Sequence, residues 1–295
     1  MNDKKILILT MSCNLPHYKA LTGAVIDTWA KPLIRGKYKN VHWFGYTACD
    51  DKHPNPMIDF DNHMIYVDTP DGLYNTYEKT QKAWEMIKDV VDFNYVVRTN
   101  ASVFLNVENL LKRLSTLDND VIVGRHEHNV VFYVPSKEVK IEFWLMWGFF
   151  FCMNKDFFDY TMGADKNFIE KCYHPGADKY TDDEIISLKI NELLGFNYKS
   201  ASIEHTQEDI IYSYKTYDPK DKTISKNIVE KVYSVHQDVV VTEPDEINNH
   251  VILRLRTFYD NLDNIGTGIK TRSEKGFELK HFYELNDAYK NSFNK

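Results

Sequence analysis

The sequence has little glycine and proline, few cysteines and no long hydrophobic run. Glycine (12) and proline (9) together make up about 7% of the 295 residues, against an average of ~12%, which excludes collagen-like and low-complexity chains. The four cysteines form no CxxC pair and no metal-ligand spacing, so we expect reduced thiols that serve packing. The longest apolar run, residues 143–153, is interrupted only by Gly148. It is about half of the ~20 residues that a membrane-spanning helix needs.

Charge of one sign is not in excess either. The chain has 36 Lys+Arg and 43 Asp+Glu, a net charge of −7 and a pI of about 5.9, so any polyanion would have to meet a local basic patch. Aromatic residues at 14% and hydrophobic residues at 43% exclude a disordered chain. The first apolar run covers only residues 6–9. This is too short for a secretory signal, and we expect a soluble, cytoplasmic protein.

Strand and helix patterns alternate along the first part of the chain. Strands are predicted at residues 4–11, 41–47, 63–67, 93–97 and 120–124, and helices at residues 21–29, 74–91 and 106–117. This rhythm favours an α/β fold with a parallel sheet. Further strands are expected at residues 130–134, 144–153 and 197–203, and further helices at residues 155–160 and 185–194. Asn154 and the capping box that starts at Thr181 begin these two helices.

The chain after about residue 208 is polar and rich in Tyr, Lys and Asp. Helices are predicted there around residues 224–232 and 277–293. We therefore divide the chain into a main domain of residues 1–207 and a mostly helical C-terminal extension of residues 208–295 that packs on it.

Five short segments follow one another over residues 4–205. They are residues 24–30 (AVIDTWA), 71–80 (DGLYNTYEKT), 95–106 (YVVRTNASVFLN), 147–154 (WGFFFCMN), and 181–184 (TDDE) followed by 193–196 (LLGF). In this order and at these spacings they resemble the motifs of the β-1,3-galactosyltransferase and fringe-like glycosyltransferases. The resemblance implies a GT-A type fold, which is a Rossmann-like mixed sheet flanked by helices. It also implies a hexosyl- or pentosyltransferase that uses a nucleotide-sugar donor.

The chain departs from this family at the acidic triplet that holds the divalent ion. The triplet is Asn100-Ala101-Ser102 here, and neutral oxygens are poor ligands for the hard cations Mn²⁺ and Mg²⁺. Three explanations stay open. Another site holds the metal, cationic side chains neutralise the diphosphate instead, or donor binding is lost.

Candidate donor-binding residues lie where the predicted strands end, because ligands of open α/β sheets bind at the carboxyl ends of the strands. Together with the resemblance, this rule nominates Thr10, Ser12, Lys79, Arg98, Asn100 and Ser102. Two later candidates are Arg254 and Arg256, which alternate with Val251, Leu253 and Leu255 and would form a phosphate clamp in place of the metal. The alternatives are pairing of Lys79 and Arg98 with surface carboxylates, and a solvated edge for the two late arginines.

The resemblance nominates Asp183 as the general base, by its match to the second acid of the family's Glu-Asp motif. Asp182 is the second catalytic candidate, since adjacent like charges raise one pKa toward neutrality. The alternative is that both acids only favour the helix dipole. Trp147 and Gly148 would form an acceptor platform, or else a core strand. His205 and His236 are candidates for the C-terminal histidine that many GT-A enzymes place on metal or phosphate, or else structural residues.

The resulting hypothesis is an inverting glycosyltransferase with a UDP-sugar donor and a glycan acceptor. Its metal dependence stays open, and a bacterial or viral source fits a chain in which we find no anchor. One alternative keeps the chemistry and changes the acceptor to a hydroxymethylated base in phage or viral DNA, which would need a basic groove and base flipping. The other is a catalytically inactive sugar- or nucleotide-binding module.

Overall fold

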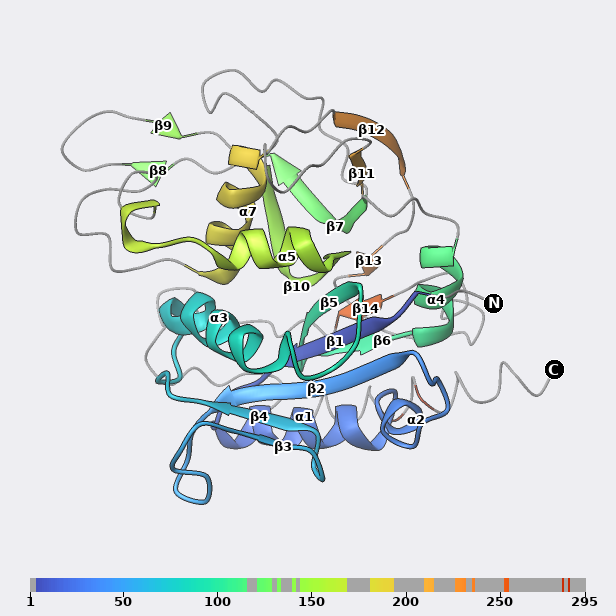
Figure 1. Cartoon of the computed structure of the whole chain (residues 1–295), viewed down its shortest axis with the longest axis vertical. Helices are drawn as coiled ribbons and strands as arrows, with labels where there is room; N and C mark the ends of the chain where they lie inside the picture. Colours follow the sequence, from blue (N-terminus) through green and yellow to red (C-terminus); the bar gives the residue numbers. More distant parts are fainter. Residues whose placement is uncertain are drawn as a thin grey trace.

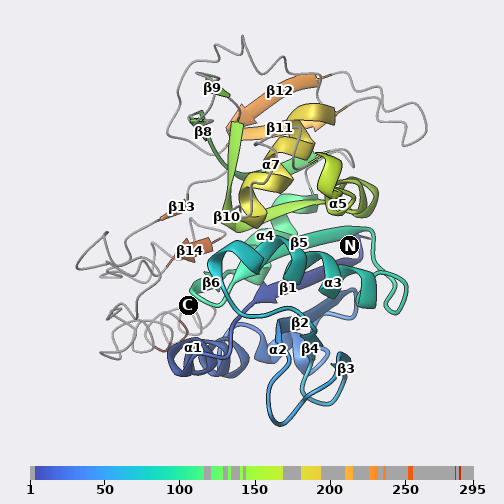
Figure 2. The same cartoon turned by 90° about the vertical axis from the view of Figure 1, so that its left-hand side faces the viewer.

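A mixed sheet with helices on both faces forms the centre of the protein (Figures 1 and 2). The computed structural model describes residues 4–115, 121–128, 132–133, 140–141, 144–168, 181–193, 210–214, 226–231, 235–236 and 252–254, and single residues 283 and 286. The predicted α/β architecture, a mixed sheet flanked by helices, is confirmed. Within the described residues no helix is long and apolar enough to cross a membrane.

Nine strands form the main sheet in the order β12-β11-β7-β10-β5-β1-β2-β4-β3. Their bounds are β1 (Ile6–Met11), β2 (Val41–Ala48), β3 (Met57–Asp59), β4 (Met64–Val67), β5 (Tyr95–Asn100), β7 (Val121–His128), β10 (Trp144–Asn154), β11 (Ile210–Tyr214) and β12 (Lys226–Lys231). Two small sheets contain β6 (Val103–Leu105), β14 (Ile252–Arg254) and β13 (Val235–His236), and β8 (Phe132–Tyr133) with β9 (Lys140–Ile141). The helices are α1 (Pro16–Asp27), α2 (Lys31–Ile34), the 3₁₀ turn η1 (Leu73–Asn75), α3 (Thr76–Ile87), α4 (Val107–Ser115), α5 (Lys155–Met162) and α7 (Asp182–Leu193).

The central strands run parallel, so their carboxyl ends share one edge of the sheet. β1 pairs in parallel with β2 and β5, and β2 pairs in parallel with β4. The apolar first residues of β1 are fully buried, as a parallel strand covered on both faces requires. β10 is antiparallel to β5, with Phe150 opposite Thr99. The first half of β10, including Gly148, therefore lies beside the carboxyl end of β5.

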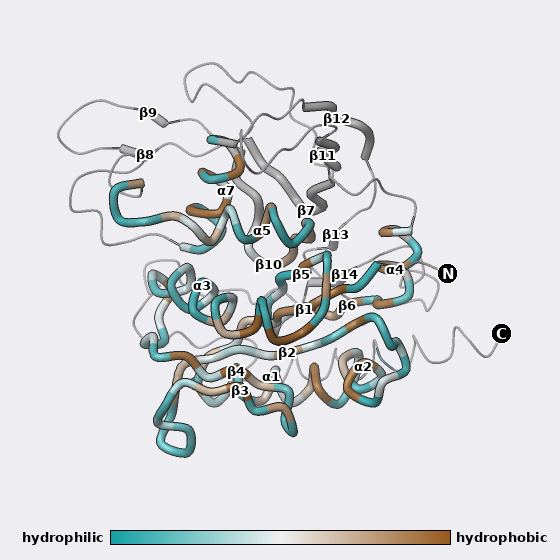
Figure 3. The backbone as a smooth tube through the Cα atoms, viewed as in Figure 1, coloured by the Kyte–Doolittle hydropathy of each residue, from teal (hydrophilic) through white to brown (hydrophobic). Residues whose placement is uncertain are grey.

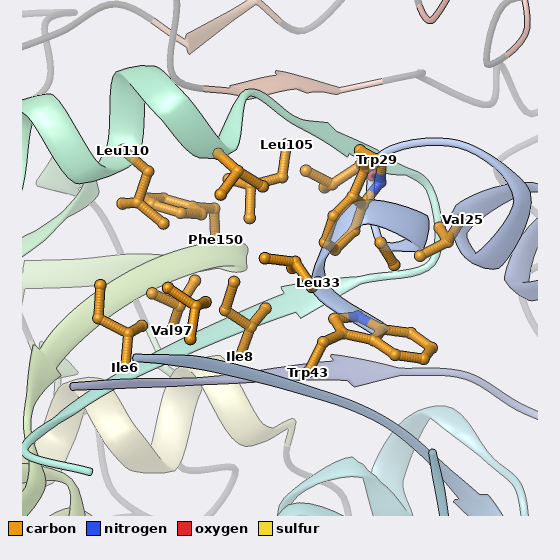
Figure 4. Close-up of a cluster of buried hydrophobic side chains, with 14 of the residues drawn as sticks. Ile6, Ile8, Val25, Trp29, Leu33, Trp43, Val97, Leu105, Leu110 and Phe150 are labelled. Atoms are coloured by element: carbon orange, nitrogen blue, oxygen red, sulfur yellow. Dashed lines mark hydrogen bonds between the residues drawn. The ribbon is translucent and has the colours of Figure 1, made fainter. Parts of the chain in front are cut away.

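Alternate side chains of the strands supply two core layers. On one face, Ile6, Ile8, Val97 and Phe150 pack with residues of α1, α2 and α4 (Figure 4). On the other face, the neighbouring positions Leu7, Leu9, Val96 and Phe151 pack under α3, α5 and α7. The hydropathy colouring follows this arrangement, because much of the central strands is brown and the surface turns are largely teal (Figure 3).

The start of α5 depends on a side-chain cap. Asn154 Oδ1 accepts a hydrogen bond of 2.8 Å from the backbone N–H of Phe157, as the sequence predicts. Replacing Asn154 with alanine is expected to lower the free energy of unfolding by about 1 kcal/mol, because one N–H at the helix start loses its partner. Urea denaturation followed by circular dichroism measures this. Asn154→Asp is the matched control and should stay within about 0.5 kcal/mol of the parent, whereas equal losses in both variants would refute the cap.

Three cysteines lie in described parts of the chain and are free thiols: Cys13, Cys49 and Cys152. Burial raises the pKa of Cys13 to about 11 and that of Cys152 to about 12. Neither side chain is a thiolate nucleophile at neutral pH. Cys172 lies outside the described residues.

Two predicted elements are wrong in detail. The segment predicted as a helix at residues 224–232 contains strand β12, because its β-branched residues Ile228 and Val229 favour a strand that β11 pairs with. The strand predicted at residues 93–97 continues to Asn100, because pairing with both β1 and β10 extends past Val97.

The described part of the C-terminal extension is mainly strand rather than helix. β11 and β12 extend the main sheet beyond β7, and β14 pairs with β6. Residues 283 and 286, which are helical, fall within the helix predicted for residues 277–293. The strand predicted at residues 197–203 lies outside the described residues, and the division of the chain at residue 207 stays a prediction.

Candidate functional site

Two consecutive carboxylates open α7 beside the carboxyl end of β5. The N–H of Thr181 donates to Glu184 Oε2 at 2.7 Å, which is one half of the predicted capping box. The N–H of Asp182 donates to Thr76 Oγ1 at 2.9 Å. The first turn of α7 is therefore attached to the start of α3. Asp182 and Asp183 then point to different partners.

Asp182 faces the interior of the protein. Its side chain is 4% exposed and forms an ion pair with Arg98 of β5, which is fully buried. The hydroxyl of Thr80 lies 3.5 Å from the same carboxylate oxygen. Burial raises the pKa of the Asp182 carboxyl, Arg98 opposes this effect, and the neighbouring charge of Asp183 adds to it. The charge of Asp182, the first acid of the predicted catalytic pair, is therefore neutralised by Arg98 in the sheet.

Asp183 is half-buried and binds β10. Its Oδ2 accepts the backbone N–H of Gly148 at 3.2 Å. Its Oδ1 accepts the hydroxyl of Thr181 and the N–H of Glu184, the latter at 3.1 Å. A carboxylate offers about four lone-pair positions, so one position, on Oδ2, has no hydrogen-bond partner among the described residues.

Position 148 allows only glycine at this distance from α7. A Cβ there would lie 2.9 Å from Asp183 Cβ and 3.1 Å from its Oδ2. Any larger residue would therefore displace the carboxylate. The contact of Gly148 with Asp183 was not predicted, and the predicted role of Gly148 toward an acceptor stays a prediction.

Arg98 and Asn100 lie on one face of β5, because alternate residues of a strand share a face. The guanidinium lies 5.8 Å from the ring centroid of Phe151, and Nη2 lies 3.3 Å from the sulfur of Met11. Six buried side-chain atoms have no hydrogen-bond partner among the described residues, and three of them lie here: Arg98 Nε, Arg98 Nη1 and Asn100 Oδ1. Buried polar atoms are almost always paired. We therefore expect bound water at the two Arg98 nitrogens, and water or a ligand at Asn100 Oδ1.

Lys79, in the first turn of α3, connects this helix to Ser12, the residue that follows β1. It is 2% exposed, forms an ion pair with Asp71 and donates to the carbonyl of Ser12 at 3.2 Å. Asp71 in turn accepts the N–H of Asn14 at 2.6 Å. Lys79 was expected to bind donor or pair with a surface carboxylate, and its partner is this half-buried aspartate. The charge of Lys79 is therefore neutralised within the protein.

The hydroxyls of Thr10 and Ser12 are also engaged internally. Thr10 Oγ1 accepts the indole N–H of Trp43 at 2.9 Å, and Ser12 Oγ lies 2.5 Å from Thr22 Oγ1. Both side chains are buried. Donor contact by either residue stays a prediction, and it would have to use the backbone or displace these bonds.

The remaining predicted residues are placed by the backbone only or lie outside the described residues. Ser102 follows β5 and is half-buried. Arg254 ends β14 at the position opposite Val103, next to Ser102. His236 of β13 pairs with Leu253 of β14. Trp147 lies in β10 just before Gly148. His205 and Arg256 lie outside the described residues.

The described residues do not offer a divalent cation the ligands it prefers. They contain no group of three or more His, Cys, Asp or Glu that could hold a metal ion. Asn100 and Ser102 present neutral oxygens, and Ala101 between them is a buried methyl group. The segment Asn100-Ala101-Ser102 therefore does not fit a site for a divalent cation.

Sequence reasoning missed the residues that hold the site together. Thr76 and Thr80 contact Asp182 from α3, and Thr181 binds Asp183 instead of accepting a backbone N–H. The sequence contains one local indication of the role of Thr76 and Thr80. Their spacing of four residues puts them on one face of a helix that also buries Tyr77 and Trp84.

The fold and the site together define an α/β protein with a carboxylate pair at the carboxyl edge of its parallel strands. No family model matches the chain, and no curated protein sequence matches it. Among solved structures, the chain is similar to the apo form of the glycosyltransferase GlyE from Streptococcus pneumoniae TIGR4, with 15% identity and a TM-score of 0.31. The similarity covers 65% of this chain and 43% of GlyE, so the chain spans less than half of that protein. With so low a TM-score, it defines neither a family nor a reaction for this chain.

Proposed function

We propose that this protein is a glycosyltransferase that uses Asp183 as the general base. The observation that carries the proposal is the oriented carboxylate of Asp183, fixed by Gly148 and Thr181, with one position on Oδ2 that no described residue fills. It lies beside the end of β5, where Asn100 has a buried oxygen without a partner among the described residues. The motifs that resemble the fringe-like enzymes contain these same residues, which gives the proposal independent support.

The reaction that fits this arrangement is a single displacement with inversion. The acceptor hydroxyl donates a hydrogen bond to Asp183 Oδ2, and Asp183 takes its proton as the acceptor oxygen attacks the anomeric carbon. The bond between that carbon and the diphosphate oxygen breaks, and the nucleoside diphosphate leaves with the electron pair. The protein contributes mainly by holding donor, acceptor and base in line.

The donor would bind at the end of β5. Asn100 Oδ1 is an acceptor and suits a hydroxyl of the ribose or of the sugar. The leaving diphosphate needs positive charge, and the register of β14 brings the backbone of Arg254 next to Ser102. We propose Arg254 as the cation that supplies this charge, with Arg256 as its partner in the clamp. A UDP-sugar donor, a glycan acceptor and a cytoplasmic location in a bacterium or a virus-infected cell complete the proposal and rest on the resemblance alone.

Calorimetric titration of UDP-, GDP-, CMP- and dTDP-sugars, each with and without Mn²⁺, tests the proposal. We expect one donor class to bind, UDP-sugars first, with an affinity that changes less than about threefold when Mn²⁺ is added. Arg254→Gln should weaken that binding about tenfold, the effect of losing one charge-assisted contact, while Lys112→Gln on the exposed side of α4 serves as the matched control.

Other outcomes are equally clear. Donor binding that requires Mn²⁺ would contradict the cationic clamp and point to metal ligands elsewhere in the chain. Binding without any transfer or donor hydrolysis would favour the inactive binding module. Steeply salt-dependent binding to duplex DNA would favour the DNA-modifying alternative. Absence of binding to every donor would refute the proposed function.

A further inference from the structure

We infer that Arg98 and Asp182 form a positioning pair that sets the orientation of Asp183, so that they control the rate of the reaction without touching donor or acceptor. The inference rests on the proposed function for its kinetic consequences. It assigns roles different from those that the sequence suggested, which were donor binding for Arg98 and catalysis for Asp182.

Burial separates this pair from any substrate. Arg98 has no exposed surface and Asp182 is 3% exposed. Phe151 lies over the guanidinium at 5.8 Å from its ring centroid, and the sulfur of Met11 contacts Nη2. The charge of Arg98 is already neutralised by Asp182, so a phosphate group would gain little from it. Donor binding is therefore the less suitable role for this arginine.

Asp182 is connected to the proposed base, Asp183, by a single peptide bond. Asp182 and Asp183 are consecutive residues in the first turn of α7, and their Cα atoms are about 3.8 Å apart across one rigid peptide plane. Successive side chains of a helix diverge by about 100°. Fixing the direction of Asp182 toward β5 therefore fixes the direction of Asp183 toward β10.

The same sheet holds both ends of this arrangement. Arg98 lies opposite Phe151 in the pairing of β5 with β10, and Gly148 lies three residues before Phe151 in β10. Two neighbouring strands thus bind two neighbouring carboxylates of α7. A shift or rotation of α7 would have to break the Arg98 ion pair and the Gly148 hydrogen bond together. A displacement of about 1 Å in a reacting group can cost about 10²-fold in rate.

A buried ion pair fixes the direction of its two side chains, whereas apolar packing at the same place does not. Replacing a buried ion pair by apolar residues of similar volume is often neutral for stability, but it removes the preferred direction of the charged hydrogen bond. The double variant Arg98→Met with Asp182→Leu should therefore fold and still lose the orientation of Asp183. This separates a positioning role from a purely structural one.

Steady-state kinetics of nucleotide release in the full chain, with and without acceptor, tests the kinetic part. For the double variant we expect kcat to fall about 30- to 100-fold, with the donor Kd and KM within about threefold of the parent. The single variant Arg98→Lys keeps both the charge and Asp182, and it should retain most of the kcat of the parent. A tenfold rise in donor Kd with unchanged kcat would overturn the inference and make Arg98 a donor contact. An unchanged kcat and KM would leave the pair a structural role only.

Hydrogen exchange of the Gly148 amide tests the positioning part without any assay of activity. This N–H is bound to Asp183 in the parent, and we expect its exchange to be at least about tenfold faster in the double variant. Exchange rates of α1 amides, which lie on the opposite face of the sheet from α7, serve as the control and should not change. Unchanged exchange at Gly148 would overturn the inference. Faster exchange in a protein that neither binds nor cleaves nucleotide sugars would refute the proposed function alone.

Discussion

Asp183→Asn is expected to slow sugar transfer by about 10²- to 10⁴-fold, the range that a general base contributes. The amide has nearly the same shape as the carboxylate but cannot accept the proton of the acceptor hydroxyl. Its oxygen can still accept from Thr181 and Glu184, which leaves the amide nitrogen facing the N–H of Gly148. Donor affinity should stay within a few-fold, because the proposed donor contacts lie at the end of β5. Initial-rate kinetics together with calorimetry of the donor measure both quantities.

Two further variants make this result specific. Asp156→Asn removes a carboxylate from the same part of another helix, the exposed first turn of α5, and should leave the rate unchanged. Gly148→Ala keeps Asp183 but adds a Cβ at 2.9 Å from its Cβ, so it should lower kcat by at least about tenfold. A rate for Asp183→Asn equal to that of the parent would mean that another group takes the proton.

The architecture could be predicted because the central strands are apolar on both faces. The runs that become β1, β2 and β4 each lie between polar turns, and helices with a clear apolar stripe follow β4 and β6. Local periodicity is sufficient for such elements. The cap at Asn154 and the helix start at Thr181 are predictable for the same reason, since a helix start is a local signal. The hydroxyl of Thr181 does not cap the helix but binds Asp183.

The interior of the site could not be predicted, because its determining contacts are between distant parts of the chain. A polar run after Val97 is typical of a turn, yet β5 continues past it: pairing with β10 reaches Thr99 and pairing with β1 reaches Asn100. Nothing near Arg98 in the sequence indicates that its partner is Asp182. The resemblance nominated Arg98 for donor binding and Asp182 for catalysis, and it did not indicate that the two side chains pair. It could not tell which of two adjacent acids faces the interior, because that depends on how α7 is rotated against the sheet.

The tail shows the opposite error, in which a local pattern predicted the wrong element. The segment around Ile228 contains charged residues at spacings that suit a solvated helix, but it pairs with β11 as an edge strand. Tertiary pairing overrides weak propensity in such segments. The proposed phosphate clamp depends on another strand of the tail, β14. The pairing of β14 with β6 brings the backbone of Arg254 to the end of β5.

Asp182→Leu alone is expected to lower the free energy of unfolding by about 3–5 kcal/mol, because it leaves the charge of Arg98 buried without a partner. Natural domains have only about 5–15 kcal/mol of stability, so this single variant should be close to unfolding at room temperature. The double variant Arg98→Met with Asp182→Leu removes both charges and should return to within about 1 kcal/mol of the parent. Urea denaturation of the parent, both single variants and the double variant gives the coupling between the two residues.

The exposed ion pair of Lys5 with Asp92 is the matched control for this cycle, since its side chains are 45% and 78% exposed. Its coupling should be below about 1 kcal/mol, because water screens the charges and the long side chains lose entropy when they pair. A coupling of Arg98 with Asp182 no larger than this would mean that the pair is solvated in solution, and Asp182 would then regain its place as a candidate for catalysis. A large coupling, together with the slow but stable double variant expected above, would make the buried pair the element through which the sheet directs Asp183.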